Sequence, residues 1–328
     1  MTRAVALRLG AYAGALALAF AGAFALGSAV DPIAAADPAP KSDHAGPADE
    51  MGDDMGDGTA GHEAGHSDPG AQPPGLAVSQ DGYTLVPATT FFQPGKPSTL
   101  KFTVNGPDGK PVTQYTKTHE KDLHLIVVRR DLSGFRHVHP TRDASGAWSI
   151  PFDFTAGGTW RIFTDFQPAA LGKTLTLGTD VNVSGLYIPV PLPAASSVTS
   201  VDGYDVTLGG TPAAGKESEL TFTVSKNGKP VTDLEPYLGA FGHLVSLRSG
   251  DLAYLHNHPA QMAEPGSKGG PQVKFGTTFP TASTYSLFLD FQHAGKVHTA
   301  EFRVDVTGKA IVPGAMPTPG SEDTPHGH

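Results

Sequence analysis

The sequence predicts an all-β protein made of two tandem immunoglobulin-like β-sandwich domains, and three observations carry that prediction. The 328 residues include 40 glycines and 29 prolines, and only 17% are charged, a composition that disfavours helices and suits short strands joined by turns. Apolar residues recur with period two, as at Trp160, Ile162, Thr164 and Phe166, which would share one face of a strand. Related motifs also recur about 120 residues apart, so two units of similar structure are expected.

The first segment, residues 1–36, predicts export. Arg3 and Arg8 precede an uncharged apolar run over residues 9–30, which reaches the ~20 residues that a bilayer-spanning helix needs. Three alanines at 34–36 offer a small-residue cleavage site. The segment is therefore either a cleaved signal peptide or a retained N-terminal anchor helix. Both alternatives place the rest of the chain outside the cytoplasm, secreted or anchored to the membrane by residues 9–30.

Residues 37–74 are predicted to form a disordered acidic tether that contains methionine and histidine. Nine acidic residues stand between 37 and 70 against one lysine, with little that could fill a core. Residues 62–66 have the spacing of the zinc-protease motif H-E-x-x-H, but the adjacent glycines and Pro69 oppose the helix that this motif requires. With this acidic segment set aside, the remaining folded part is close to neutral, which predicts no nucleic-acid partner.

The two units follow the tether. The first is expected at 75–187 and the second at 199–308, with a Pro-rich linker at 188–198 between them and a disordered tail at 309–328. The flanking motifs correspond in order, for example 81–83 with 202–204 and 109–113 with 228–232. Because two diverged units retain the same motifs, the shared residues are the candidates for a site.

Each unit contains three histidines and a carboxylate at matched positions. A histidine lies in an apolar strand-like run, a His-x-His-Pro motif follows, and an Asp-Phe-Gln motif comes later. Residues two apart in a strand point to the same side, so both histidines of a His-x-His pair can face one ion. The candidate metal residues are His124, His137, His139 and Asp165 in the first unit, and His243, His256, His258 and Asp290 in the second.

The chemistry of the two sets of three histidines and one aspartate favours a metal site over a metal-free network or a catalytic site. The chain has no cysteine, so only nitrogen and oxygen ligands are available. Each aspartate is either a fourth ligand or the acceptor of a ligating histidine's outer N–H, and the second role is favoured. A hydrogen-bonded network without metal and a catalytic histidine–aspartate arrangement stay open. His119 occurs only in the first unit, so the two sites are expected to differ.

At these motifs the chain resembles a group of exported, uncharacterised actinobacterial two-repeat proteins. The resemblance covers 75–308 and includes the string His-Leu-Ile-Val-Val-Arg-Arg-Asp-Leu at 124–132. A looser resemblance is to CopC-type periplasmic copper-carrier sandwiches, which implies copper carriage, although their amino-terminal histidine ligand has no counterpart here. Residues 135–139 also resemble the copper-binding strand of Cu/Zn superoxide dismutase, without its cysteine pair.

The predicted function is extracytoplasmic binding of copper, or alternatively zinc, for buffering, delivery or resistance, with one site per unit. Imidazole suits both ions, Cu(II) stands highest in the Irving–Williams order, and methionines in the tether add soft ligands. A membrane metal transporter or another metal carrier is the expected partner. Two alternatives remain: a metal-free interaction or adhesion-type sandwich module with structural histidines, and a superoxide dismutase-like metalloenzyme. Since no hydrolytic motif is present, a non-enzymatic role is favoured.

Overall fold

The computed structural model describes residues 72–307. The predicted N-terminal segment, nearly all of the tether and the tail fall on residues 1–71 and 308–328, outside the described part. Every regular element between 72 and 307 is a β-strand, which confirms the all-β prediction. Over the same range, no helix is present that could cross a membrane. Both repeats belong to one compact unit.

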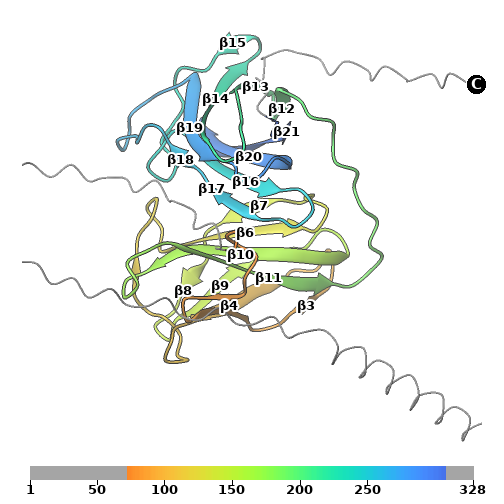
Figure 1. Ribbon diagram of the computed structural model, residues 1–328, viewed down its shortest axis with the longest axis vertical. Coiled ribbons are helices and arrows are strands. Elements are labelled where there is room, and N and C mark those ends of the chain that lie inside the picture. Colours follow the sequence, from red (N-terminus) through yellow and green to blue (C-terminus); the bar gives the residue numbers. More distant parts are fainter. Residues whose placement is uncertain (1–71, 308–328) are drawn as a thin grey trace, which may run out of the picture. The chain divides into compact units, whose positions relative to one another are not determined.

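The first repeat is a sandwich of two sheets that are antiparallel except for one short parallel pair (Figure 1). One sheet has the order β1 (Ser79–Gln80), β2 (Tyr83–Pro87), β4 (Thr99–Asn105), β9 (Ala147–Pro151), β8 (Thr141–Arg142). The other has the order β3 (Phe91–Phe92), β11 (Leu175–Val183), β10 (Gly158–Pro168), β6 (Leu123–Arg129), β7 (Arg136–Val138), and β5 (Tyr115–Thr116) also pairs with β10.

The second repeat has the same arrangement. One sheet has the order β12 (Val198–Val201), β13 (Tyr204–Gly210), β14 (Glu217–Lys226), β19 (Gln272–Thr278), β18 (His258–Pro259), with β15 (Lys229–Pro230) beside β14. The other has the order β17 (Tyr254–His256), β16 (His243–Arg248), β20 (Thr284–His293), β21 (Lys296–Asp305). The prediction of two tandem immunoglobulin-like sandwiches is therefore confirmed.

Alternation along β10 follows the period-two pattern of the sequence. Trp160, Ile162 and Phe166 point into the core between the two sheets of the first repeat, whereas Phe163 points to the opposite face. That opposite face is also buried. As a result the whole of β6 is buried, which explains its continuous apolar run of leucine, isoleucine and valine.

The outer faces of β6–β10 and β16–β20 pack on one another and form a third apolar core between the repeats. Phe135 of the first repeat stacks on Phe288 of the second, with ring centroids 3.8 Å apart and planes inclined by 2°. Residues at this position of a sandwich normally face water, but Phe288 is only 1% exposed. The residues of the inter-repeat core come from both units: Ile126, Val128, Leu132, Phe163, Val245, Leu247, Leu252, Tyr254 and Phe288.

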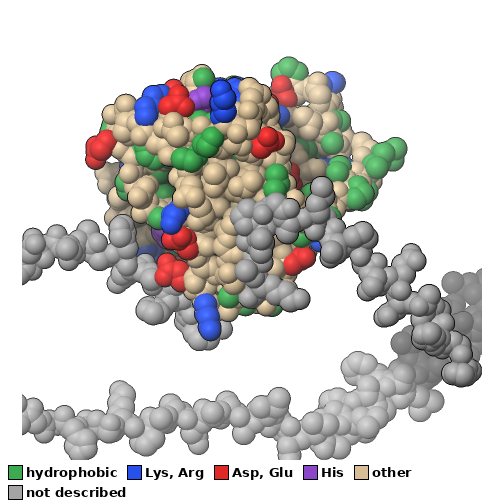
Figure 2. Space-filling model, turned by 90° about the horizontal axis from the view of Figure 1, so that it is seen from above, with side chains coloured by type: hydrophobic (Ala, Val, Ile, Leu, Met, Phe, Trp, Pro, Cys, Tyr) green, Lys and Arg blue, Asp and Glu red, His purple; other side chains and the backbone are tan. Residues whose placement is uncertain are grey.

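The surface of the described part is mixed in charge. In Figure 2, lysine and arginine side chains are interspersed with aspartate and glutamate on the visible face. Several of these charges form ion pairs, such as Lys296 with Asp202 at 2.8 Å and Lys274 with Glu219 at 3.0 Å. The view shows no continuous basic stripe.

Candidate metal centre

The three histidines of the first repeat are positioned by the β6–β7 pair. In its register Leu125 is opposite Val138, and Ile126 is opposite His137. His124 precedes Leu125, and His139 directly follows the end of β7, so both lie at the same end of the pair. Side chains two apart share a face. His124, His137 and His139 therefore project from the outer face, toward the second repeat.

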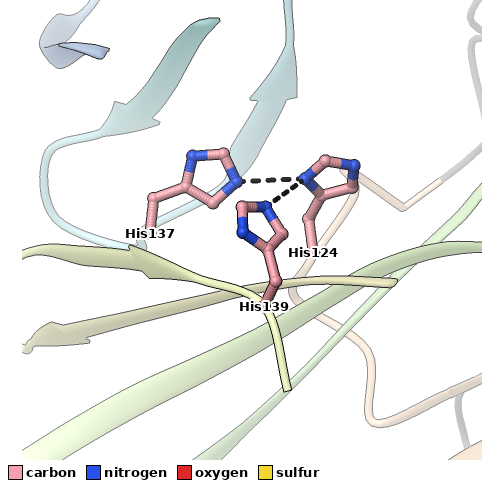
Figure 3. A group of neighbouring side chains, drawn as sticks. All are labelled: His124, His137 and His139. Atoms are coloured by element: carbon pink, nitrogen blue, oxygen red, sulfur yellow. Dashed lines mark hydrogen bonds between the residues drawn. The ribbon is translucent and has the colours of Figure 1, made fainter. Parts of the chain in front are cut away.

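The ring nitrogens of these histidines converge (Figure 3). His124 Nδ1 lies 3.1 Å from His137 Nε2 and 3.1 Å from His139 Nε2. All three ligand atoms lie within 4.8 Å of one another. In a tetrahedral site with metal–nitrogen bonds of ~2.0–2.1 Å, neighbouring nitrogens are ~3.3 Å apart. The two separations of 3.1 Å fit neighbouring ligands around one small cation.

The outer nitrogens of two of these rings fix where the lone pairs point. His124 Nε2 donates to the carbonyl oxygen of Thr118 at 2.9 Å. His137 Nδ1 donates to Oδ2 of Asp290 at 2.8 Å, because a carboxylate can only accept. When both rings are neutral, their inner nitrogens, His124 Nδ1 and His137 Nε2, both carry lone pairs. These nitrogens are 3.1 Å apart, and a cation between them would bind to both.

Burial opposes an extra proton on His124 and on His139. His124 is 3% exposed, and burial, followed by repulsion from His137 when that ring is protonated, lowers the pKa of His124 to about 4. Burial, followed by the charges of His137 and His124, lowers the pKa of His139 to about 2. At neutral pH these two rings are uncharged, which is the form that binds a metal.

The two predicted aspartates differ in their partners, because Asp290 reaches the other repeat and Asp165 bonds within its own. We expected Asp290 to serve the histidines of its own repeat, but its carboxylate accepts the N–H of His137 in the first repeat and the hydroxyl of Thr299. Asp165 lies opposite His124 in the β6–β10 register, accepts a hydrogen bond from Thr176 at 3.0 Å, and counteracts the lowering of the pKa of His124. Asp290 thus orients a candidate ligand from outside the metal position.

The predicted set in the second repeat is arranged differently. His243 is buried and donates from Nε2 to the carbonyl oxygen of Leu238 at 3.2 Å. His258 is exposed and lies in β18, which pairs with β19 in the other sheet. The side chain of His256 is outside the described part. Between residues 72 and 307 the described side chains form one group of three metal-type ligands, and it is the group in the first repeat.

Asn257 explains the difference between the repeats. It occupies the position of Val138, and its buried amide donates to the carbonyl oxygens of Leu244 and Leu255 while its oxygen accepts from Thr277 on β19. These bonds hold the chain where it crosses from one sheet to the other. The residue that follows Asn257 therefore joins β18, whereas His139 stays beside β6.

Two loop residues outside the repeated motifs, His119 and Tyr237, also lie beside these histidines. The ring of His119 packs edge-on against His243, with centroids 4.7 Å apart. The ring of Tyr237 lies 6.4 Å from His139 and 6.1 Å from His243, and burial raises its phenol pKa to about 12. The sequence singled out His119, because the second repeat has no counterpart of it. No feature of the sequence singled out Tyr237.

A small cavity is lined by histidines of both repeats. Its volume of about 10 Å³ is close to the ~10–15 Å³ that a single water molecule requires, so it has room for one atom-sized guest. Its walls come from both repeats: His119, His124, His137, Asp165, His243, Leu244, Val245, Tyr254 and Asn257.

Comparison with family models identifies the repeated unit. The model described as "Domain of unknown function (DUF8832)" matches twice, over residues 77–185 and 199–308. The chain belongs to this family. The two DUF8832 segments coincide with the two sandwiches, and the three-histidine group belongs to the first of them.

Comparison with curated proteins finds no match. Among solved structures, the DUF8832 pair is similar to the Escherichia coli adhesin FdeC, at 18% identity and a TM-score of 0.23, with 71% of this chain and 66% of that one covered. It is also similar to Salmonella alpha-2-macroglobulin (13% identity, TM-score 0.26, coverage 72% and 15%) and to the D0-D1 domain of intimin (15% identity, TM-score 0.19, coverage 68% and 97%). The chain spans less than two thirds of the first two of these structures.

Proposed function

We propose that this protein binds a divalent metal ion, Cu(II) or alternatively Zn(II), through His124, His137 and His139. The observation that carries the proposal is the pair of inner nitrogens at 3.1 Å whose protons are directed outward, to Thr118 and Asp290. Ligating histidines in metal sites usually donate their other N–H to a carbonyl or a carboxylate in this way. Both outer bonds are present in the structure.

The ligand chemistry selects the ion. Three neutral imidazoles without a thiolate suit Cu(II) and Zn(II), and the Irving–Williams order favours Cu(II). Together with the export segment and the methionines of the tether expected from the sequence, this supports an extracytoplasmic role in copper buffering, delivery or resistance. A membrane transporter or a second carrier is the partner that would receive or supply the ion.

A titration of the full chain with Cu(II) and with Zn(II) by isothermal calorimetry tests this proposal. We expect a tight equivalent in the wild type that is lost in the double variant His137→Ala, His139→Ala. His258→Ala is the matched control, because it removes an exposed histidine of the corresponding motif in the second repeat. The terminal histidines and the tether are the same in every sample, so any loss of binding comes from the substituted residues. Tight binding that is unchanged in the double variant would contradict the proposal.

The second candidate is the interaction module predicted as an alternative. The observation that favours it is that His137 and Asp290 link the two repeats at the edge of their shared apolar core, a role that requires no metal. In this case the histidines fix the angle between two sandwiches that present their surfaces to another protein. This candidate predicts the same thermal unfolding with and without added Cu(II) or Zn(II). A shift to higher temperature with either ion would count against it.

A further inference from the structure

His243 repeats the arrangement of His124 on the other side of the cavity. Each is the first histidine of its repeat, each is buried in the strand next to the edge strand, and each donates from Nε2 to a carbonyl of the preceding loop: Thr118 for His124 and Leu238 for His243. In both rings the inner nitrogen is consequently Nδ1, with its lone pair available. The ring of His243 lies 6.0 Å from that of His124 and 6.1 Å from that of His137.

These separations exclude His243 from the first metal position. The group whose ligand atoms lie within 4.8 Å of one another contains His124, His137 and His139 but not His243. Two ligands on the same ion with bonds of ~2.0–2.1 Å cannot be farther apart than ~4.2 Å. An ion bound by His243 would therefore occupy a separate, neighbouring position.

His119 supplies a further imidazole at that position. It comes from the first repeat and lines the cavity together with His243, and the two ring centroids are 4.7 Å apart. The loop that presents it has two consecutive non-glycine residues with positive φ, 46° at His119 and 65° at Glu120. Such backbone is strained for residues with side chains and recurs where a functional group must be held in place.

The backbone of the second repeat follows the first as far as His256. In the second repeat β17 pairs with β16 so that His256 is opposite Val245, as His137 is opposite Ile126 in the first. His256 thus occupies on β17 the backbone position that His137 occupies on β7. His258, the third histidine of the second motif, lies in the other sheet. His119 packs against the ring of His243.

We propose that His119 and His243 form a second metal position beside the first, so that two divalent ions lie next to each other between the repeats. The pair is asymmetric, because one ligand of the second position is contributed by the first repeat. It extends the proposed function, and it can fail while the first position stands.

Electron paramagnetic resonance of the full chain titrated with Cu(II) tests the pair. We expect two tight equivalents, and a dipolar-broadened spectrum with a half-field transition once both positions are filled. In His119→Ala, and separately in His243→Gln, one tight equivalent and the half-field transition should be lost. The spectrum of the remaining isolated Cu(II) should match that of the first equivalent in the wild type. Thermal unfolding with circular dichroism confirms that each variant is folded.

The outcomes separate the two proposals. Two coupled equivalents that persist in both single variants would overturn the second position. A wild type that binds one tight equivalent, lost only in His137→Ala, His139→Ala, would also overturn it while supporting the first position. No tight equivalent in any sample would overturn both. If His243→Gln fails to fold, the loop variant His119→Ala decides the question alone.

Discussion

Replacing Asp290 by asparagine should weaken metal binding at a site in the other repeat. Asp290 is 2% exposed, and its two carboxylate oxygens accept from His137 Nδ1 at 2.8 Å and from Thr299 Oγ1 at 2.6 Å. Asparagine has the same shape but offers one oxygen and no charge, so the charge-assisted bond to His137 is lost. Removing an outer partner of a metal-bound histidine typically costs 10- to 100-fold in affinity, or about 1.4–2.8 kcal/mol.

The assay is a competition titration of Cu(II) against a chelator of known affinity, with wild type and variant side by side. Asp202→Asn is the matched control, because Asp202 accepts from His298 Nδ1 at the same distance of 2.8 Å but that pair is separate from the three-histidine group. We expect Asp290→Asn to raise Kd by 10- to 100-fold and Asp202→Asn to leave it unchanged. An affinity within twofold of wild type for Asp290→Asn would refute the reasoning that the second repeat orients a ligand of the first.

Three further predictions concern stability and the cavity. The pKa of His124 is about 4 when folded and ~6.5 when unfolded, so below pH 6.5 the unfolded state takes up the proton first. Protonation of this residue should then lower the free energy of unfolding of the metal-free protein by ~1.4 kcal/mol per pH unit between pH 6.5 and pH 4. Urea titration measures this slope, and His124→Gln should flatten it. Phe288→Ala should cost ~3–5 kcal/mol by the same method, against less than ~0.5 kcal/mol for Phe91→Ala, which is 75% exposed; equal losses would contradict the inter-repeat core. Tyr237→Phe should leave Cu(II) affinity within about threefold, because the ring of Tyr237 lies 6.4 Å from that of His139 and its phenol is outside the proposed ligand set. A loss above tenfold would make the hydroxyl a ligand.

The sequence was sufficient for the sandwiches and for the first group of histidines, because both depend on local periodicity. Trp160 and Phe163 alternate as expected, and the His-x-His spacing placed His137 and His139 on one face. The arrangement of the second group depended on contacts that no pattern contains. Asn257 moves His258 to the other sheet through bonds to residues that are distant in the sequence, such as Thr277.

The sequence also did not predict the contact between the repeats. The outer faces of the two sheets are as apolar as the cores, but a strand that is buried on both sides gives the same sequence pattern whatever covers it. For that reason Asp290 was grouped with the histidines of its own repeat. It does lie opposite His243 in the β16–β20 register, but its carboxylate accepts from His137 of the first repeat. The motif predicted one site in each repeat, and the contact between the repeats brings Asp290 to a histidine of the first.

The position of a bound ion in a crystal of the Zn(II)-loaded protein tests the central claim most directly. Anomalous scattering at the zinc edge locates the metal without reference to the protein model. We predict a peak ~2.0–2.1 Å from His124 Nδ1, His137 Nε2 and His139 Nε2, with the bond from His137 to Asp290 intact. No peak there, with the His124 and His137 nitrogens still 3.1 Å apart, would contradict it.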